Sequence, residues 1–244
     1  MAAWLAERHG LETVHPQRGW EALRKIGWSI QTARPCNPKA ATPEEQEAFK
    51  RKLEGTVVET RSAHPDLPVE VWAIDEHRLG LKPVRRRVWA PAGQRPIALG
   101  HHRYKWLHVT AFVQPTSGET AWYLSNAINK PLFEKLLEDF ARQTGAGQQR
   151  IIVLVLDNAG WHGPANLTVP DGIRLVFLPP YTPELQPAER LWSLVDEPVA
   201  NRYFETLDDL SETLAKRCCT LQDDPETISG HTDFPWWPAT MGRN

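Results

Sequence analysis

The sequence predicts an α/β fold in which a mixed β-sheet carries helices on its faces, with a smaller helical segment before it. Two observations lead to this prediction. Residues 151 to 156 form an unbroken apolar run, which is typical of a strand buried on both faces in the parallel part of a sheet. Apolar residues at helical spacing, from Phe133 to Phe140, precede this strand. The 244 residues, 41% of them hydrophobic, suffice for one full core and a small accessory domain.

The first part of the chain, residues 1 to about 53, is expected to form helices and turns. Residues 19 to 26 repeat apolar side chains at helical spacing and are followed by a glycine, which ends the helix. Residues 28 to 32 are expected to form a short extended arm or wing. A further helix is predicted to begin after Thr42, because this cap is followed by proline and two acids, and to run toward Leu53.

From residue 69 onward, short apolar strands replace the helical pattern. The expected order is four strands, a helix, two strands and two helices, which favours a mixed sheet with helices on its faces. The last twenty residues are expected to be irregular. The predicted strands are 69–75, 87–89, 107–113, 118–124, 151–156 and 173–178, and the predicted helices are 133–144, 187–200 and 207–221.

The distribution of charge is more informative than its total. The formal net charge of −2 gives no global sign of a nucleic-acid binder, but residues 82 to 105 hold seven basic side chains and no acid. We expect this segment to contact DNA phosphates, against the alternative of a solvated charged face. Its proposed contact residues are Lys82, Arg85, Arg86, Arg87, Arg103 and Lys105.

A second set of basic residues lies in the N-terminal helical part. Arg18, Arg24, Lys25 and Arg34 line a candidate recognition helix and wing, which fits docking in the major groove of DNA. The alternative is a small helical packing unit without a DNA role.

Cysteine content and hydropathy exclude several classes of protein. Three cysteines, Cys36, Cys218 and Cys219, without CxxC spacing argue against a disulfide framework or a zinc site. No apolar run approaches the roughly 18 to 20 residues of a membrane span, and no signal peptide is visible. A cytoplasmic protein with no membrane contact is therefore expected.

Three acidic residues stand in distinctive settings and are the candidate site. Asp75 and Asp157 each follow an apolar strand, and Glu189 lies in a proline-rich stretch at the expected start of a helix. Carboxylates held on rigid elements at the edge of a core are well placed to bind Mg²⁺, which prefers hard oxygen ligands. We expect two ions bridged by Asp75, with Asp157 on one and Glu189 on the other, an arrangement suited to in-line phosphoryl transfer.

Each acid also has an ordinary structural interpretation. A single Asp after a strand is more often a turn or cap residue, and a single Glu is more often on an exposed helix face. The repetition of an unusual context three times favours the site. Asn158, His162 and Glu76 are candidate accessory residues. His162 is expected to contact the scissile phosphate or a metal-bound water, and Asn158 to orient Asp157 or bond DNA, with packing or surface roles as the alternatives.

These contexts resemble the DDE transposases of bacterial insertion sequences in the mariner-like superfamily, over roughly residues 4 to 240. The resemblance implies a ribonuclease-H-like catalytic domain, with Asp75, Asp157 and Glu189 as catalytic residues and as ligands of Mg²⁺ or Mn²⁺. The matching motifs are Ala73-Ile-Asp-Glu76, Leu156-Asp-Asn-Ala-Gly-Trp-His162 and Leu178-Pro-Pro-Tyr-Thr-Pro-Glu-Leu-Gln-Pro-Ala-Glu-Arg-Leu-Trp192.

The resemblance also implies a function and a domain plan. The function would be metal-dependent cleavage and strand transfer of an insertion sequence in bacterial cytoplasm, at the nucleoid, with double-stranded transposon ends and target DNA as partners and a homodimer as the assembly. A ribonuclease-H-like nuclease without strand transfer and an inactive truncated DNA-binding remnant are the alternatives. The expected parts are a partial, winged-helix-like helix-turn-helix over 1–40, a linker helix over 41–66, the catalytic domain over 67–225 and an irregular tail over 226–244.

Overall fold

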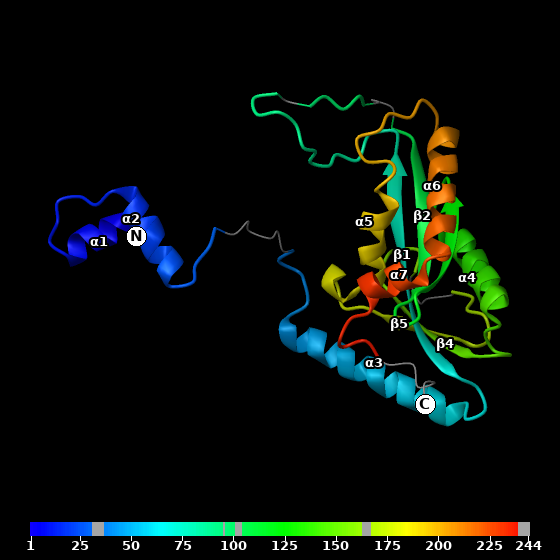
Figure 1. Cartoon of the computed structure of the whole chain (residues 1–244). Coiled ribbons are helices and arrows are strands. Elements are labelled where there is room, and N and C mark those ends of the chain that lie inside the picture. Colours follow the sequence, from blue (N-terminus) through cyan, green and yellow to red (C-terminus); the bar gives the residue numbers. More distant parts are fainter. Residues whose placement is uncertain (31–36, 95, 101–103, 163–166, 239–244) are drawn as a thin grey trace. The chain divides into compact units, whose positions relative to one another are not determined.

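The computed structural model describes residues 1–30, 37–94, 96–100, 104–162 and 167–238. The chain divides into two compact units, Met1–Pro38 and Lys39–Asn244, and each is described by itself (Figure 1). Of the residues named from the sequence, Arg34, Cys36 and Arg103 lie outside the described residues.

The first unit is built from two short helices, α1 (Ala2–Arg8) and α2 (Pro16–Lys25). They approach closely at Gly19, where an added Cβ atom would lie 2.7 Å from the backbone nitrogen of Ala2. A glycine is therefore required at this crossing. Residues 28–30 lie in no helix or strand, and the rest of the predicted arm is outside the described residues.

The second unit begins with a long helix, α3 (Pro43–Ala63). It starts where the sequence predicts, with the Thr42 side chain accepting from the backbone of Glu45 and the Glu45 side chain accepting from that of Thr42. It continues ten residues beyond Leu53, because Val57 extends the buried stripe of the helix.

A five-stranded mixed sheet forms the centre of the second unit, and this confirms the predicted α/β class (Figure 1). The strand order is β3-β2-β1-β4-β5, in which β1 pairs with β2 and β2 with β3 in antiparallel fashion, while β1–β4 and β4–β5 are parallel. The strands are β1 (Val69–Gly80), β2 (Trp106–Gln114), β3 (Glu119–Ser125), β4 (Ile151–Leu156) and β5 (Ile173–Phe177).

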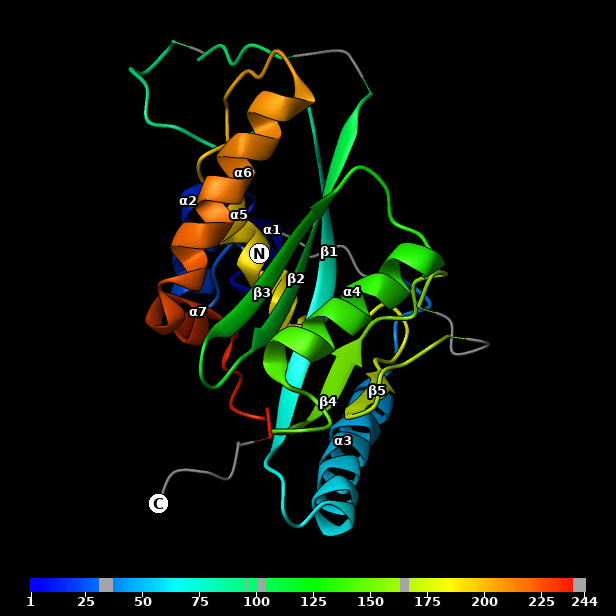
Figure 2. The same cartoon turned by 90° about the vertical axis from the view of Figure 1, so that its right-hand side faces the viewer.

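Helices bury both faces of this sheet. On one face α4 (Lys130–Thr144) packs with its Phe133 and Phe140 against strand residues such as Trp72 and Ile74 (Figure 2). On the other face α3, α6 (Leu207–Gln222) and α7 (Pro225–Thr232) share a core with the alternate strand residues. Side chains therefore alternate between two cores along β1 and β4, as the two-residue period of a strand requires.

Several predicted elements differ in the structure. The predicted strand 87–89 is wrong, since residues 82–89 lie in no strand. β1 does not end at Asp75 but continues to Gly80, because β2 pairs with it along the whole polar stretch as far as Gly80 and Trp106. A carboxylate expected at a strand end thus lies inside a strand.

The predicted helix 187–200 is also wrong. The chain instead forms two 3₁₀ turns, η1 (Pro183–Leu185) and η2 (Pro187–Leu191), and a single helical turn, α5 (Trp192–Val195). Pro187 lies in the first turn, where a proline is tolerated, but Pro198 lacks the backbone N–H that a helix continuing to residue 200 would need. The predicted irregular tail contains α7, which begins because the Asp224 side chain accepts from Thr227 N and Pro225 follows the cap. None of the helices in the described ranges is long and apolar enough to cross a membrane.

Candidate active site

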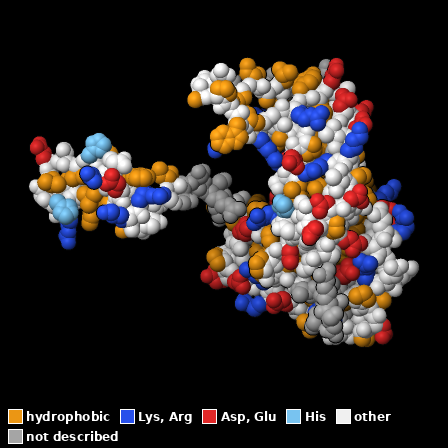
Figure 3. Space-filling model, in the orientation of Figure 1, with side chains coloured by type: hydrophobic (Ala, Val, Ile, Leu, Met, Phe, Trp, Pro, Cys, Tyr) orange, Lys and Arg blue, Asp and Glu red, His pale blue; other side chains and the backbone are white. Residues whose placement is uncertain are grey.

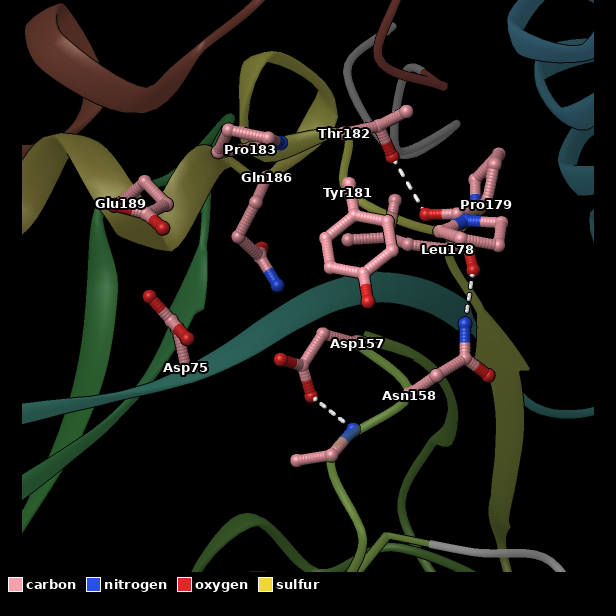
Figure 4. A pocket seen from close by; sticks show the side chains of 12 residues that line it. Asp75, Asp157, Asn158, Leu178, Pro179, Tyr181, Thr182, Pro183, Gln186 and Glu189 are labelled. Carbon is pink, nitrogen blue, oxygen red and sulfur yellow. Dashed lines mark hydrogen bonds between the residues drawn. The ribbon is translucent and has the colours of Figure 1, made fainter. Parts of the chain in front are cut away.

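Asp75, Asp157 and Glu189, which lie far apart in the sequence, line one cavity of about 450 Å³ (Figure 4). They come from three elements: the middle of β1, the residue after β4, and η2. The other lining residues are Asn158, Ala159, Leu178, Pro179, Pro180, Tyr181, Thr182, Pro183 and Gln186.

The strand register explains how two of the acids come together. β1 and β4 are parallel neighbours, and their last paired residues are Ala73 and Val155. Asp75 and Asp157 each lie two residues beyond this pair. Both therefore point to the sheet face that carries Ala73 and Val155, which is the face covered by α3, α6 and α7.

Asp75 is a half-buried carboxylate with a specific donor. The indole Nε1 of Trp192 donates a hydrogen bond to its Oδ2 over 2.7 Å. Burial, and then the negative charge of Glu189, raise the pKa of Asp75 well above its usual range. A carboxylate in this setting is costly to ionise unless a cation lies close by.

Glu189 is carried by a segment that is tied to β1. The buried Gln186 donates from Nε2 to the backbone oxygen of Ile74 over 2.9 Å, directly beside Asp75, and its Oε1 caps η2 at Ala188. Burial raises the pKa of Glu189; the nearby His77 opposes this rise, and the negative charge of Asp157 adds to it. Glu189 thus repels Asp75, and Asp157 repels Glu189.

Asp157 differs from Asp75 because two donors hold one of its oxygens. Oδ1 accepts from the backbone of Ala159 over 2.9 Å and from Nδ1 of His162 over 2.7 Å. Burial would raise the pKa of Asp157, but these hydrogen bonds outweigh it and lower the pKa below its usual value. The other oxygen points toward Asp75 (Figure 4).

His162 lies behind Asp157 and is not part of the cavity lining. Its ring is fully buried, contacts Phe133 with 4.4 Å between ring centroids, and joins Asp157 to Glu76 Oε1, which lies 3.0 Å from Nε2. Burial would lower the pKa of His162, but the hydrogen bonds to the two carboxylates raise it to about 9. Both ring nitrogens bond carboxylates of the protein. In this geometry His162 therefore does not make the expected contact with a phosphate or a metal-bound water.

Asn158 and Tyr181 form the opposite wall. Asn158 Nδ2 donates to the backbone oxygen of Leu178 over 2.6 Å and so joins the loop after β4 to the loop after β5 (Figure 4). Asn158 therefore ties two loops together. Tyr181 has a φ of 53°, unusual for a non-glycine residue, and its side chain is 56% exposed beside the cavity.

The donor set of the cavity fits a divalent cation. Its acidic lining groups include the three carboxylates, and no Lys or Arg is among the described lining residues. Carboxylate oxygens are the ligands that Mg²⁺ and Mn²⁺ prefer. Within the described ranges, no three His, Cys, Asp or Glu side chains are close enough together to hold one ion as they stand. The acids surround the cavity instead of touching, as like charges do.

The predicted DNA-contact residues lie in two places. In the first unit Arg18, Arg24 and Lys25 are exposed on α2, where Arg18 pairs with Glu21 over 2.9 Å. In the second unit the basic residues lie in the exposed segment between β1 and β2. Figure 3 shows Lys and Arg side chains gathered beside this segment.

One of these basic residues is fixed to the body of the second unit. Arg86 donates from Nη2 to the backbone oxygen of Ser193 over 2.6 Å. Asn201, which has a positive φ of 57°, bonds the backbone of Arg86 on both sides. Arg86 is thereby held against α5 through Ser193 and against the turn after α5 through Asn201.

Sequence reasoning did not predict the contacts that hold the acids in place. Trp192, Gln186 and the pair formed by His77 and Asp196, whose Nε2 and Oδ1 are 2.8 Å apart, all surround Asp75 or Glu189. His77 also stacks on the Trp192 ring at 5.0 Å between centroids. Trp192 and Gln186 lie in the motif around Glu189, but their partners are more than a hundred residues away along the chain.

The mixed sheet with helices on both faces is the predicted ribonuclease-H-like fold, and the three acids line a cavity beside its strands β1 and β4. The chain belongs to the DDE superfamily endonucleases, whose family model matches residues 70–211. A winged helix-turn helix model matches residues 1–53, which extends past the first compact unit into α3.

The chain is also similar to individual proteins. A protein of Sinorhizobium fredii (strain NBRC 101917 / NGR234), y4pE/y4sA, is 35% identical over 138 residues, which are 56% of this chain and 93% of that protein. The mariner Mos1 paired end complex with Mn shares 15% identity at a TM-score of 0.59, covering 94% of this chain and 71% of that one. The corresponding complex with Mg gives 16% and 0.58, with 96% and 72% covered. The Mos1 strand transfer complex gives 16% and 0.53, with 93% and 71% covered.

Proposed function

We propose that this chain is a transposase that cleaves DNA and transfers strands with Asp75, Asp157 and Glu189 as its catalytic residues. The single observation that carries the proposal is that these three acids, from three separate elements, line one cavity. The similarity in fold to Mos1 complexes with a transposon end, with Mn or with Mg, and to the Mos1 strand transfer complex, supports the same class of reaction.

The cavity is proposed to hold Mg²⁺ or Mn²⁺, as two ions, through the same three acids. Bound there, divalent ions would activate the attacking oxygen and stabilise the leaving oxygen of an in-line displacement. The chain's own contribution is orientation. The Trp192 indole holds Asp75 by one oxygen, and His162 and Ala159 hold Asp157 by one oxygen. Gln186 fixes the segment that carries Glu189 to the strand that carries Asp75.

Double-stranded DNA is the proposed partner, contacted by basic residues of both units. Lys82, Arg85, Arg87 and Lys105 are exposed between β1 and β2, and the basic residues of α2 are exposed in the unit matched by the winged helix-turn helix model. Such phosphate contacts would give an affinity that falls steeply with salt. A homodimer is the proposed assembly, and a bacterial cytoplasm, at the nucleoid, is the proposed location.

The experiment combines cleavage and joining in one assay. Labelled DNA carrying the sequences that flank the gene is incubated with the chain, a target plasmid and Mg²⁺ or Mn²⁺. We expect nicked ends and labelled plasmid, both absent in Asp157→Asn. Hydrolysis without joining would identify a nuclease that lacks strand transfer. Cleavage by Asp157→Asn at the parent rate would refute the assignment of the acids, and no cleavage by the parent chain would favour an inactive remnant.

A further inference from the structure

Glu76 and His162 lie outside the cavity and form a hydrogen-bonded row with Asp157, which lines it. We propose that His162 is a positioning residue, anchored by Glu76, which fixes the Asp157 carboxylate so that Oδ2 faces the cavity. The inference rests on the proposed function, in which Asp157 is a metal ligand.

Asp157 needs such a support more than Asp75 does. Asp75 lies within a strand, whereas Asp157 is the first residue after β4, in a stretch without helix or strand. Its side chain is 51% exposed. A side chain in this setting is free to change rotamer unless other groups hold it. The two hydrogen bonds described for Asp157 both end on Oδ1, and they leave Oδ2 for the cavity.

The anchor of the imidazole is the strand that carries Asp75. Glu76 is the next residue of β1, and its side chain points to the opposite sheet face, where α4 packs. There the 7% exposed Glu76 carboxylate meets the fully buried His162 ring against Phe133. The two hydrogen bonds of His162 therefore fix the position of Asp157 relative to β1. Because Asp75 is also on β1, they fix Asp157 relative to Asp75 as well.

Three observations give His162 this role and exclude a direct one. Its ring has no exposed surface, it does not line the cavity, and each ring nitrogen already bonds a carboxylate. Partners of this kind behind metal ligands set ligand orientation, and their loss typically weakens metal affinity about 10- to 100-fold.

Two substitutions separate the two bonds of the ring. In His162→Asn the amide nitrogen occupies the place of Nδ1 and keeps the bond to Asp157, but the bond to Glu76 is lost. In His162→Gln the amide nitrogen occupies the place of Nε2 and keeps the bond to Glu76, but the bond to Asp157 is lost. His231→Gln is the matched control, because His231 is exposed on α7 and bonds only locally, to the backbone of Thr227.

The readouts are Mn²⁺ affinity of the purified chain, from the electron paramagnetic resonance signal of free Mn²⁺, and the midpoint of urea unfolding. We expect His162→Gln to bind Mn²⁺ about 10- to 100-fold more weakly, while His162→Asn stays near the parent and the control. We expect His162→Asn to be the less stable of the two variants. It leaves the buried Glu76 carboxylate without its partner, whereas His162→Gln removes a partner only from the half-exposed Asp157.

Two results would overturn the inference. One is Mn²⁺ binding by His162→Gln at parent affinity. The other is that, in both variants, Mn²⁺ affinity falls in proportion to the urea midpoint of unfolding. That result is expected if the His162 ring contributes only to packing. A parent chain that binds no Mn²⁺ would refute the proposed function itself. Parent binding that is lost in Asp157→Asn but unchanged in His162→Gln would refute only the role of His162.

Discussion

Trp192 donates a hydrogen bond from its indole Nε1 to Oδ2 of Asp75 over 2.7 Å, across 117 residues of sequence. Trp192 is the first residue of α5 and follows the 3₁₀ turn that carries Glu189. This bond therefore connects one acid of the cavity directly to the element that carries another. It also occupies one oxygen of Asp75 with a neutral donor, so that the charge of the carboxylate is not neutralised within the protein.

Replacing Trp192 by Phe should weaken metal binding more than folding. The substitution keeps an aromatic ring on His77 but removes the donor to Asp75. We expect Mn²⁺ affinity and DNA cleavage to fall about 10- to 100-fold. Trp122→Phe is the control, since its indole bonds Thr120 on β3 and lies outside the cavity. Equal Mn²⁺ affinities in the two variants would contradict the role given to Trp192.

Replacing Gln186 by Leu should loosen the attachment of η2 to β1. The buried backbone oxygen of Ile74 would lose its donor, and we expect a loss of about 1–3 kcal/mol in the free energy of unfolding, together with weaker cleavage. Urea denaturation measures the first effect. Gln143→Leu, at an exposed site on α4, should change stability by no more than about 0.5 kcal/mol. A Gln186→Leu chain as stable as this control would show that the tie is dispensable.

Gly118 should tolerate no side chain, because the turn between β2 and β3 meets the start of α7 there. A Cβ atom at Gly118 would lie 1.8 Å from the backbone oxygen of Pro225, and φ is +76°. Gly93 has a similar φ of +83° but open space around it, so Gly93→Ala isolates the cost of backbone strain. We expect Gly118→Ala to be the less stable by about 1–3 kcal/mol in thermal or urea unfolding. Equal stabilities would mean that α7 is not docked on this turn.

The adjacent cysteines should differ sharply in reactivity. Burial raises the pKa of the Cys218 thiol to about 12, and its side chain belongs to the core, whereas Cys219 is exposed. Because the thiolate is the reactive form, Cys218 should not react at pH 8 in the folded chain. In a Cys36→Ser background, a disulfide reagent should label one thiol quickly and the second only after unfolding. Rapid labelling of two thiols would contradict the packing of α6.

Much of the fold could be predicted from local sequence patterns. The apolar run at β4, the amphipathic spacing of α4 and the Thr42 cap of α3 each depend on neighbours in the chain. Elements that depend on distant partners were predicted less well. Polar residues 75–78 remain in a strand because β2 pairs with them, and α7 forms around a cap in a stretch with little hydrophobic pattern.

The candidate site divides in the same way. The acids and His162 were recognisable because each stands in a distinctive local motif. Their relationships were not, because they arise from the β1–β4 register and from contacts such as Trp192 with Asp75 and His162 with Glu76. The sequence suggested that His162 would meet substrate, and the structure instead buries it between two carboxylates.

Joint binding of divalent cations by Asp75, Asp157 and Glu189 can be seen by anomalous diffraction. Crystals of the full chain are soaked in Mn²⁺, and Asp157→Asn crystals are treated identically. We predict Mn²⁺ peaks inside the cavity, with oxygens of the three acids at about 2.0–2.2 Å, and their loss or weakening in the variant. Strong peaks elsewhere on the chain, with the cavity empty of Mn²⁺ at saturating concentration, would contradict the account.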